Sequence, residues 1–348
     1  MALGIGVVGL ASFYSSYYAG RATEHPGTTV AAAARLDASD EQLEALGRGT
    51  AEEFGASHDC PVYESLEELL DDDEVDAVVV NSLLARRGED AVAALEAGTP
   101  VLTGKPAAAS AKAADRIADA ARETGLVVAT TAPHRHDGRI RAARERVAEG
   151  GVGDVLRVRA SVYHAAATPS GIDARDGLAP GEPGPAYTMG YYTADLLRWF
   201  TGGADPERVT GELANGNSPF MDHPDLGSAT VRFADGAVGT MTFAMCNDDG
   251  PGYGWEIEVH GSEGTIRTDQ HGHEGTHWHG GDGGTVEAFG RSLDPVLDRQ
   301  FDAFVAAVES GEGTDAVAPG PAEAARGIEL CDAWVAAADG GVVTFGDE

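Results

Sequence analysis

Short apolar runs alternate with amphipathic stretches over the first 130 residues. The runs are typical of strands buried on both faces, and the stretches, with apolar residues three and four apart, are typical of covering helices. Because the connecting loops are short, the alternation predicts a doubly wound α/β domain with a parallel sheet. The predicted strands are 4–10, 28–34, 75–80, 100–103 and 126–130, and the predicted helices are 12–22, 39–54, one starting at Ser65, 86–97 and 109–124.

The pattern changes after about residue 131. A predicted helix at 137–149 is followed by strand-like runs joined by Gly, Asp and Asn turns, which indicates an open, mostly antiparallel sheet. We therefore expect two domains, a dinucleotide-binding type over 1–130 and an α+β type, for substrate binding and oligomerisation, over 131–348. The predicted strands are 154–164, 207–213, 227–234, 237–246, 254–260, 264–269 and 342–345, the last helices are 295–310 and 321–337, and 165–186 and 270–285 are predicted loops.

The chain of 348 residues carries 57 acidic and 24 basic residues, for a formal net charge of -33. Phosphates and anionic lipids would meet a negative field, so nucleic acid and membrane partners are disfavoured. The acids are spread along the whole sequence, and only two basic residues are lysines, Lys105 and Lys112. This composition resembles that of haloarchaeal and other salt-accumulating organisms, in which salt screens the repulsion between acidic surfaces. The charge therefore indicates a halophilic protein rather than a particular ligand.

The sequence lacks features of membrane insertion or export. No apolar run approaches the length of a membrane span, and the N-terminus lacks the basic segment of a secretory signal. The three cysteines, Cys60, Cys246 and Cys331, are odd in number and far apart, which disfavours a disulfide framework. We expect a cytoplasmic protein.

The turn after the first strand is the place where a dinucleotide would bind. In the G-x-G-x-x-G pattern, glycines let the backbone approach the pyrophosphate at a helix N-terminus. Gly9 matches the first glycine, while Ala11 and Tyr14 stand at the second and third. Ser12 and Phe13 complete the predicted cofactor-binding turn. The alternative is a doubly wound domain that no longer holds a dinucleotide.

Charged residues at the end of the second strand bear on the choice of cofactor. If Arg35 is the residue at the tip, a 2′-phosphorylated cofactor is favoured, whereas Asp37 would favour the plain form by bonding the ribose. A solvated pair of charges in a turn is the alternative. Asn81, which follows the strand at 75–80, is a further predicted cofactor-binding residue.

Lys105 and Pro106 form the most informative motif. The strand at 100–103 delivers Lys105 to its carboxyl end, the edge at which open sheets bind ligands. An ammonium there can polarise a substrate oxygen and share its proton, and Pro106 restrains the backbone. The alternative is a surface lysine in a loop, which is also the expectation for Lys112.

These motifs resemble the Gfo/Idh/MocA family, the group of glucose–fructose oxidoreductase and inositol dehydrogenase. The resemblance implies an N-terminal Rossmann domain, a C-terminal domain with an open sheet, and hydride transfer between NAD(P) and a sugar, polyol or related hydroxy compound. Of the two cofactors, NADP is slightly favoured over NAD. The matching segments occur in the family's order: the Gly9 strand, 75–80, 93–98, 101–106, 151–155 and 190–202.

The family's Glu-Lys-Pro motif is matched at Lys105 and Pro106, with Gly104 in place of the glutamate. The resemblance implies that Lys105 is catalytic and also lies among the cofactor-binding residues, together with Pro106.

A second family signature lies in the helix-like stretch after residue 187. Gly190 matches, Tyr192 falls at the position of a histidine or tyrosine, and Thr188 replaces an acid. The resemblance implies that Tyr192 exchanges the hydroxyl proton while Lys105 lowers the pKa of Tyr192 and orients the substrate. A buried aromatic is the alternative for Tyr192, and a structural role is expected for Asp195.

His164 and Tyr163, at the end of the first strand of the second domain, are secondary substrate-binding candidates with Thr188. The segment His134-Arg135-His136 follows the first domain and is a candidate to line the same cleft, although a polar loop residue is the expectation for each of the three.

Four histidines form a possible metal site. In a hairpin, His273 would face His277 and His271 would face His279, and imidazoles so arranged bind zinc, nickel or copper. We favour the alternative, an exposed loop with no metal.

Two other functions stay open. A divergent, non-catalytic member would bind a sugar-like ligand or a protein partner, as the departures at Ala11, Tyr14, Gly104 and Thr188 suggest. An enzyme that eliminates or epimerises through a transient ketone would need the same cofactor. We expect a homodimer or homotetramer formed through the open sheet.

Overall fold

The computed structural model describes residues 2–36, 38–165, 177–178, 182–216, 218, 221–247, 254–268, 276–280, 284–286, 294–311 and 319–346. The chain divides into two compact units. The first comprises Met1–Ala132, Thr168–Gly184 and Leu297–Ala325, and the second comprises Pro133–Ala167, Pro185–Val296 and Arg326–Glu348. Segments from the later part of the chain thus belong to the first unit.

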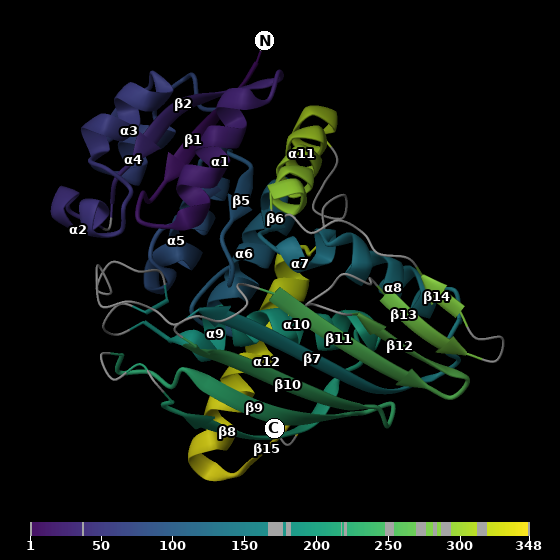
Figure 1. Cartoon of the computed structure of the whole chain (residues 1–348). Helices are drawn as coiled ribbons and strands as arrows, with labels where there is room; N and C mark the ends of the chain where they lie inside the picture. The colour runs from purple at the N-terminus through teal and green to yellow at the C-terminus, as the bar shows by residue number, and fades with distance from the viewer. Residues whose placement is uncertain are drawn as a thin grey trace. The chain divides into compact units, whose positions relative to one another are not determined.

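The first unit contains a parallel sheet with the strand order β3-β2-β1-β4-β5-β6 (Figure 1). The strand order reverses direction between β1 and β4, and such a switch point is where open sheets bind ligands, at the carboxyl ends of the strands. The predicted doubly wound fold is confirmed. Its strands are β1 (Leu3–Val8), β2 (Thr28–Ala34), β3 (Val62–Tyr63), β4 (Ala77–Val80), β5 (Val101–Thr103) and β6 (Val128–Thr130).

Helices connect these strands, and hydroxyl side chains begin most of them. Ser12, Ser65 and Ser110 each accept a hydrogen bond from a backbone N–H of the first turn, which satisfies a donor that the helix itself leaves unpaired. The helices are α1 (Phe13–Glu24), α2 (Asp40–Ala45), α3 (Ala51–His58), α4 (Leu66–Leu70), α5 (Leu84–Glu96) and α6 (Ala111–Thr124).

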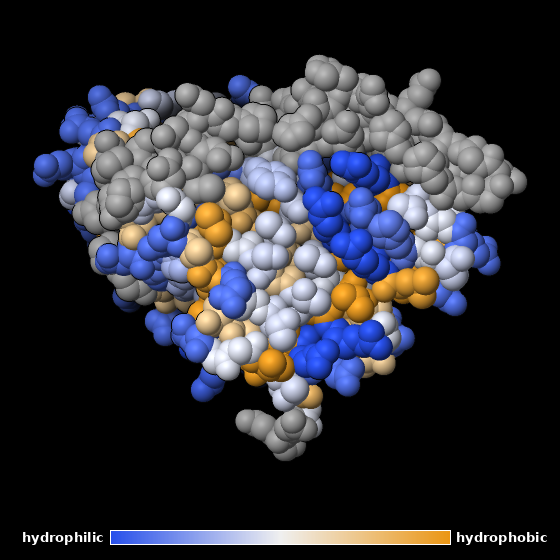
Figure 2. Space-filling model, turned by 60° about the horizontal axis from the view of Figure 1, so that its bottom comes forward, coloured by the Kyte–Doolittle hydropathy of each residue, from blue (hydrophilic) through white to orange (hydrophobic). Residues whose placement is uncertain are grey.

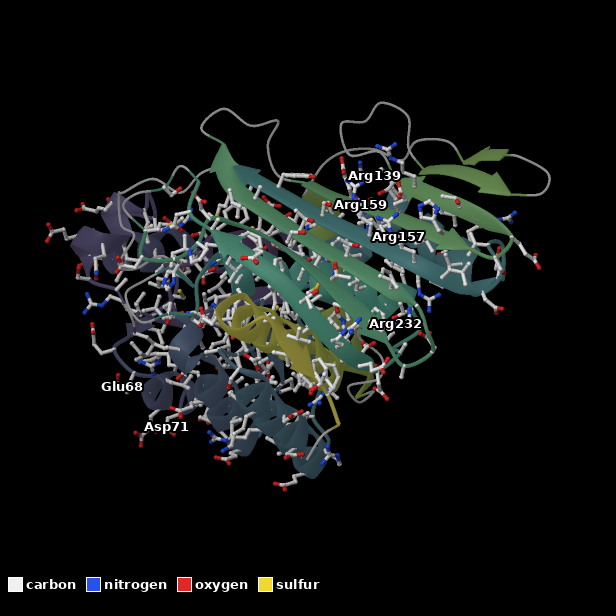
Figure 3. All side chains as sticks on the ribbon, turned by 90° about the horizontal axis from the view of Figure 1, so that it is seen from below. Glu68, Asp71, Arg139, Arg157, Arg159 and Arg232 are labelled. Carbon is white, nitrogen blue, oxygen red and sulfur yellow. The ribbon has the colours of Figure 1, made fainter. Side chains whose placement is uncertain are left out.

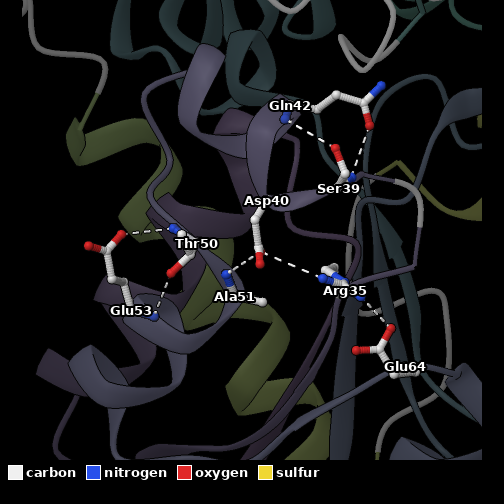
Figure 4. A network of polar contacts seen from close by, with 8 residues as sticks. All are labelled: Arg35, Ser39, Asp40, Gln42, Thr50, Ala51, Glu53 and Glu64. Atoms are coloured by element: carbon white, nitrogen blue, oxygen red, sulfur yellow. Dashed lines mark hydrogen bonds and ion pairs between the residues drawn. The ribbon is translucent and has the colours of Figure 1, made fainter.

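The single helix predicted over 39–54 is wrong, because α2 and α3 are separate helices. Gly47 and Gly49 lie between them with φ of 69° and 74°, a left-handed conformation that ends a helix. Thr50 then starts a second capping box, in which its backbone N–H donates to Glu53 and its hydroxyl accepts from the Glu53 N–H, at 2.8 and 3.1 Å (Figure 4).

Helix α11 (Asp294–Ser310) supplies a late segment to the first unit. The Gln300 side chain accepts from the N–H of Ala132 at 3.0 Å and donates to the carbonyl of Thr130 at 2.8 Å, so it fixes the chain as β6 ends. Arg21 of α1 forms a 2.6 Å ion pair with Asp302. The C-terminal part of the sequence therefore helps to hold the N-terminal sheet in place.

The second unit contains a mixed sheet with the strand order β14-β13-β12-β11-β7-β10-β9-β8-β15 (Figure 1). Only β7 and β10 pair in parallel, so the predicted open and mostly antiparallel sheet is confirmed. Its strands are β7 (Val155–Ala165), β8 (Pro206–Ala214), β9 (Leu226–Phe233), β10 (Val238–Asn247), β11 (Gly254–Gly261), β12 (Gly264–Thr268), β13 (Thr276–Gly280), β14 (Gly284–Val286) and β15 (Val342–Thr344), and its helices include α7 (Pro133–His136), α8 (Gly138–Ala148), α9 (Pro185–Thr188), α10 (Gly190–Phe200) and most of α12 (Pro321–Gly340).

The loop predicted over 270–285 is wrong in part, because β13 and β14 lie within it. Both strands are short, β13 carries two histidines and β14 is only three residues long, so the alternation of apolar residues that marks other strands is missing there. They pair with β12 and with each other and extend one edge of the sheet.

One face of this sheet is covered by helices. Trp334 of α12 is fully buried, and a Cβ at Gly211 or Gly227 would lie 2.7 or 2.9 Å from its ring. These two glycines in the strands therefore let the indole approach the sheet backbone.

The opposite face is open. On β9 the residues alternate strictly, with Ser228, Thr230 and Arg232 exposed and their neighbours buried. Figure 3 looks toward this face, with Arg157, Arg159 and Arg232 labelled, and Figure 2 shows pale, uncharged residues gathered between charged groups.

Within the described chain, no helix is long and apolar enough to span a membrane.

Candidate functional site

The turn after β1 keeps the shape of a dinucleotide-binding turn despite its altered sequence. Gly9 has φ of 80°, and a Cβ there would lie 2.6 Å from Cα of Ser82, so only glycine fits. Ser15 donates from its hydroxyl to the Gly9 carbonyl at 2.5 Å, and Ser12 caps α1. Ala11 is buried. The helix N-terminus thus sits beside a tight turn, as anion binding requires.

Tyr14, at the position of the third glycine, is accommodated on the surface of α1. Its ring stacks on that of Tyr18, with centroids 6.2 Å apart, and meets the exposed Phe13 edge-on at 5.7 Å. Tyr14 therefore belongs to an aromatic cluster on α1.

Arg35, at the end of β2, is engaged by carboxylates. Its Nη2 lies 2.6 Å from Oε2 of Glu64 and its Nη1 lies 3.6 Å from Oδ1 of Asp40 (Figure 4). The hydrogen bond to Glu64 raises the pKa of Arg35. Asp37, the other predicted residue here, lies outside the described residues.

Asn81 follows β4, next to the turn after β1. Its backbone N–H donates to the carbonyl of Val8, and its side chain is only 2% exposed. In the part of the chain that the structure describes, neither its amide nitrogen nor its amide oxygen has a hydrogen-bond partner. A buried amide in this state costs free energy unless a ligand supplies the missing partners.

Lys105 and Pro106 follow β5 at the same edge of the sheet. Lys105 is buried, the peptide between the two residues is cis, and the N–H of Gly104 donates to the carbonyl of Val80 at 2.8 Å. Lys112 is exposed on α6. The first unit therefore brings the Gly9 turn, Asn81 and the Lys105 segment to the carboxyl ends of the neighbouring strands β1, β4 and β5.

The second unit buries a polar and aromatic cluster around Tyr192. Tyr192 is fully buried near the start of α10, and its ring meets His134 edge-on at 5.1 Å and Trp255 at 5.5 Å. Thr188, the last residue of α9, is buried as well. A Cβ at Gly190 would lie 3.2 Å from the Trp334 ring, which explains the glycine of this signature.

Asp195, one turn further along α10, binds both His134 and Arg135. Its carboxylate lies 2.6 Å from Nε2 of His134 and 2.7 Å from Nε and Nη2 of Arg135. Burial pushes the pKa of this carboxyl upward, but the charge of Arg135 and the bond to His134 outweigh burial and hold the pKa well below its ordinary value. The expectation of polar loop residues at His134 and Arg135 is wrong, since both are buried in α7.

His164 and Tyr163, near the end of β7, lie on opposite faces of the sheet, as successive strand residues do. His164 shares its face with Val162, which pairs with Trp255 of the Tyr192 cluster, whereas Tyr163 lies on the other face. Both are half-buried. Of the two, His164 is thus on the side of the sheet that carries Tyr192.

The predicted pairing of histidines in a hairpin is wrong. His277 pairs with Arg267 on one side and Thr285 on the other, and His279 pairs with Thr265. His271 and His273 lie outside the described residues. Among the residues that the structure describes, no group of three or more His, Cys, Asp or Glu side chains is placed to hold a metal ion.

Known proteins resemble this chain in sequence and in fold. A 1,5-anhydro-D-fructose reductase of Ensifer adhaerens is 31% identical over 210 residues, which cover 58% of this chain and 59% of that protein. The inositol 2-dehydrogenase 2 of Saccharopolyspora erythraea is 26% identical over 337 residues, 95% of this chain and 92% of that protein. The solved structure of GenD2 from gentamicin A biosynthesis, in complex with NAD, has a TM-score of 0.79 at 24% identity and covers 99% of this chain and 97% of its own.

Two family models match separate parts of the chain. Residues 3–132 match the oxidoreductase family with an NAD-binding Rossmann fold, and residues 140–267 match the GFO/IDH/MocA C-terminal domain. The first of the curated relatives is matched over only 59% of its length. The two models together extend over most of the described chain and agree with the two sheets, so the chain belongs to the GFO/IDH/MocA family.

Proposed function

We propose that the protein is a nicotinamide-dependent oxidoreductase that moves hydride between the cofactor and a sugar, polyol or related hydroxy compound. The observation that carries the proposal is the buried, unsatisfied amide of Asn81 beside the Gly9 turn and the Lys105 segment. A buried polar group at the switch point of a doubly wound sheet suits a ligand with hydrogen-bonding groups of its own.

The residues present fit such a cofactor. The backbone N–H groups at the start of α1, from Ala11 to Phe13, would hold the pyrophosphate, and Asn81 would hydrogen-bond the bound cofactor. Lys105 and Pro106 would line the same edge. The nicotinamide, when bound, supplies the acceptor or donor of hydride.

We assign proton transfer to Lys105 and Tyr192. Lys105 would hold the reacting hydroxyl oxygen through its ammonium, and Tyr192 would exchange the hydroxyl proton. His134, held by Asp195, would keep the Tyr192 ring in place. Thr188 and His164 are the proposed substrate-binding residues of the second unit.

The contacts of Arg35 favour NAD over NADP, in contrast to the preference that the sequence suggested. A 2′-phosphate at Arg35 would lie close to the carboxylates of Glu64 and Asp40, and like charges at such distances repel. We therefore propose NAD as the cofactor.

Titration with cofactor tests the proposal. NADH should raise the melting temperature and change the fluorescence of the protein in concentrated KCl, and reduction of 1,5-anhydro-D-fructose or oxidation of inositols should be tested first, given the activities of the relatives. If neither NAD(H) nor NADP(H) changes melting or fluorescence at millimolar concentration, the protein is a non-catalytic member.

Oligomerisation and salt adaptation complete the proposal. We infer a homodimer or homotetramer that buries the outward face of the second unit's sheet, and a cytoplasmic location, which the free thiols of Cys60 and Cys331 support. The net charge of -33 supports adaptation to high salt. Melting temperature should then rise with KCl concentration as the charges are screened.

A further inference from the structure

A buried arginine joins the two strand ends that flank the candidate site. Arg87, in the first turn of α5, is fully buried. Its Nη2 and Nε donate to the carbonyl of Ser82 at 2.7 and 3.2 Å, and its Nη1 donates to the carbonyl of Pro106 at 2.8 Å. Ser82 follows β4 and Pro106 follows β5, so one planar guanidinium fixes the distance between the two segments.

Gly104 provides the space for this arrangement. A Cβ at position 104 would lie 2.6 Å from Oδ1 of Asn81 and 3.0 Å from Cζ of Arg87. Any other residue would have to displace the buried amide or press on the guanidinium. This accounts for the glycine that stands where the family motif has glutamate.

Ser82 extends the connection to the dinucleotide-binding turn. Its hydroxyl donates to Oδ2 of Asp90 at 2.5 Å, and Asp90 also accepts two hydrogen bonds from Arg86. The Cα of Ser82 is the atom that a Cβ at Gly9 would strike. The first turns of α5 therefore anchor both the Gly9 turn and the Lys105 segment.

We propose that Arg87 is a positioning residue for Lys105, with Gly104 as its structural complement. Because Arg87 donates to the carbonyls of both Pro106 and Ser82, it fixes the backbone next to Lys105 and so the position of the lysine ammonium. A displacement of about 1 Å at such a group costs up to roughly 100-fold in rate. The inference rests on the proposed catalytic role of Lys105.

The scarcity of lysine allows a direct test. The full-length protein labelled at lysine ε-positions should give two NMR signals, one from Lys105 and one from the exposed Lys112. Arg87→Lys keeps the positive charge but loses the fork that bridges two carbonyls, and it adds a third signal from the substituted position. The spectra of Lys105→Ala and Lys112→Ala assign the two native signals. We expect the Lys105 signal and its titration midpoint to move, while the Lys112 signal stays in place. Arg122→Lys, a substitution of an exposed arginine on α6, is the matched control: it also adds a third signal and should move neither the Lys105 signal nor the Lys112 signal.

Kinetics give the second measurement. Arg87→Lys should lower kcat by about 10- to 100-fold while KM and the Kd for NADH change by less than about threefold, because the fault lies in the lysine and not in ground-state binding. Gly104→Ala should also lower kcat, and it should weaken NADH binding as well, because the new Cβ would press on the amide of Asn81. In Arg87→Ala the contact of the new Cβ with the guanidinium is gone but the contact with Oδ1 of Asn81 remains. The double variant Arg87→Ala/Gly104→Ala should therefore have the kcat of Arg87→Ala and the weaker NADH binding of Gly104→Ala.

Melting curves establish first which variants fold. A folded Arg87→Lys protein with the wild-type Lys105 signal and a kcat within twofold of wild type would overturn the proposal. If Arg87 variants do not fold, the Lys105 signal of Gly104→Ala decides, because the new Cβ would press on the Cζ of Arg87. A folded Gly104→Ala protein with the wild-type Lys105 signal would overturn the proposal. The NMR signal does not depend on turnover. The two proposals can therefore fail separately. Full activity in Lys105→Ala would refute the catalytic assignment of Lys105, whereas a Lys105 signal that does not move in Arg87→Lys would refute the positioning role of Arg87.

Discussion

Arg135 binds Asp195 through two hydrogen bonds of 2.7 Å, one from Nε and one from Nη2, and both side chains are almost fully buried. Two charges removed from water are tolerated only with such a geometry, and loss of one partner leaves the other uncompensated. His134 completes the group through Asp195 and places it directly behind the ring of Tyr192. The Arg135–Asp195 pair therefore contributes to the stability of the fold, and it lies next to Tyr192, the residue proposed to exchange the proton.

Asp195→Asn should lower the free energy of unfolding by about 3–5 kcal/mol at neutral pH, because Arg135 keeps its charge in a buried site. The pKa of Asp195 is depressed in the folded protein, so on acidification the unfolded chain takes up a proton that the folded chain refuses. The stabilisation is thus complete above about pH 5 and is lost progressively as the pH falls below about 4.

Denaturant unfolding of both proteins across this pH range measures the difference directly. The gap between wild type and Asp195→Asn should shrink toward low pH. A gap that stays constant or widens would contradict the assigned pKa direction. Asp119→Asn, which removes an exposed ion pair with Arg122, should change stability by less than about 0.5 kcal/mol.

Lys105→Ala should lower kcat by about 100- to 10,000-fold, the range expected when a group that takes part in proton transfer is removed. NADH should still bind, since the α1 turn and Asn81 are intact. Steady-state rates and fluorescence titration separate the two effects. Lys112→Ala, at the other lysine, should behave as wild type, and equal losses in both variants would argue against a special role for Lys105.

Much of the fold follows from local patterns in the sequence. The buried runs that become β1, β2 and β4 and the serine caps of α1, α4 and α6 are signals carried by a few adjacent residues. The strands β13 and β14 carry no such signal, since β13 has polar Thr and His in place of alternating apolar residues and β14 is only three residues long. The segment of β13 becomes a strand because it pairs with β12, and the residues of β13 alone do not predict a strand.

The candidate site is less accessible to prediction because its pairs are distant in sequence. Arg135 and Asp195 are separated by 60 residues, and Arg87 and Pro106 by 19, so neither contact belongs to a local motif. The motifs pointed to Lys105 and Tyr192 as candidates but gave no sign of the residues that contact them or their backbone. The available signals were a basic residue in the short segment after β6, which is Arg135, and an acid among uncharged neighbours in the predicted helix, which is Asp195.

Tyr192→Phe removes one hydroxyl and keeps the ring that packs against His134 and Trp255. We therefore expect a loss in kcat of about 10²-fold or more with a change in stability below about 1 kcal/mol. Tyr63→Phe, which loses a hydroxyl bond to Asp72 in the first unit, is the control for kcat. A Tyr192→Phe enzyme with the wild-type rate would show that another group exchanges the proton.

Glu64→Gln should improve the binding of NADPH relative to NADH by roughly two- to fivefold, the worth of one exposed charge interaction. The substitution leaves Arg35 in place and removes the carboxylate that engages it at 2.6 Å. Fluorescence titration with both cofactors measures the ratio. Glu67→Gln, on α4, removes an equal charge away from Arg35 and should leave the ratio unchanged; an equal shift there would point to net charge alone.

The outward face of the second unit's sheet should carry the contact between copies. Thr230 on β9 and Thr242 on β10 lie in its uncharged part. Glutamates at both positions would bring carboxylates of both copies into a two-fold interface through this face and add repulsion to a chain of net charge -33. Light scattering in concentrated KCl should show a wild-type oligomer and a largely monomeric Thr230→Glu/Thr242→Glu variant, whereas Lys112→Glu on α6 should stay oligomeric. A monomeric wild type would show that the copies do not associate. An oligomeric double variant would show that they associate through another surface.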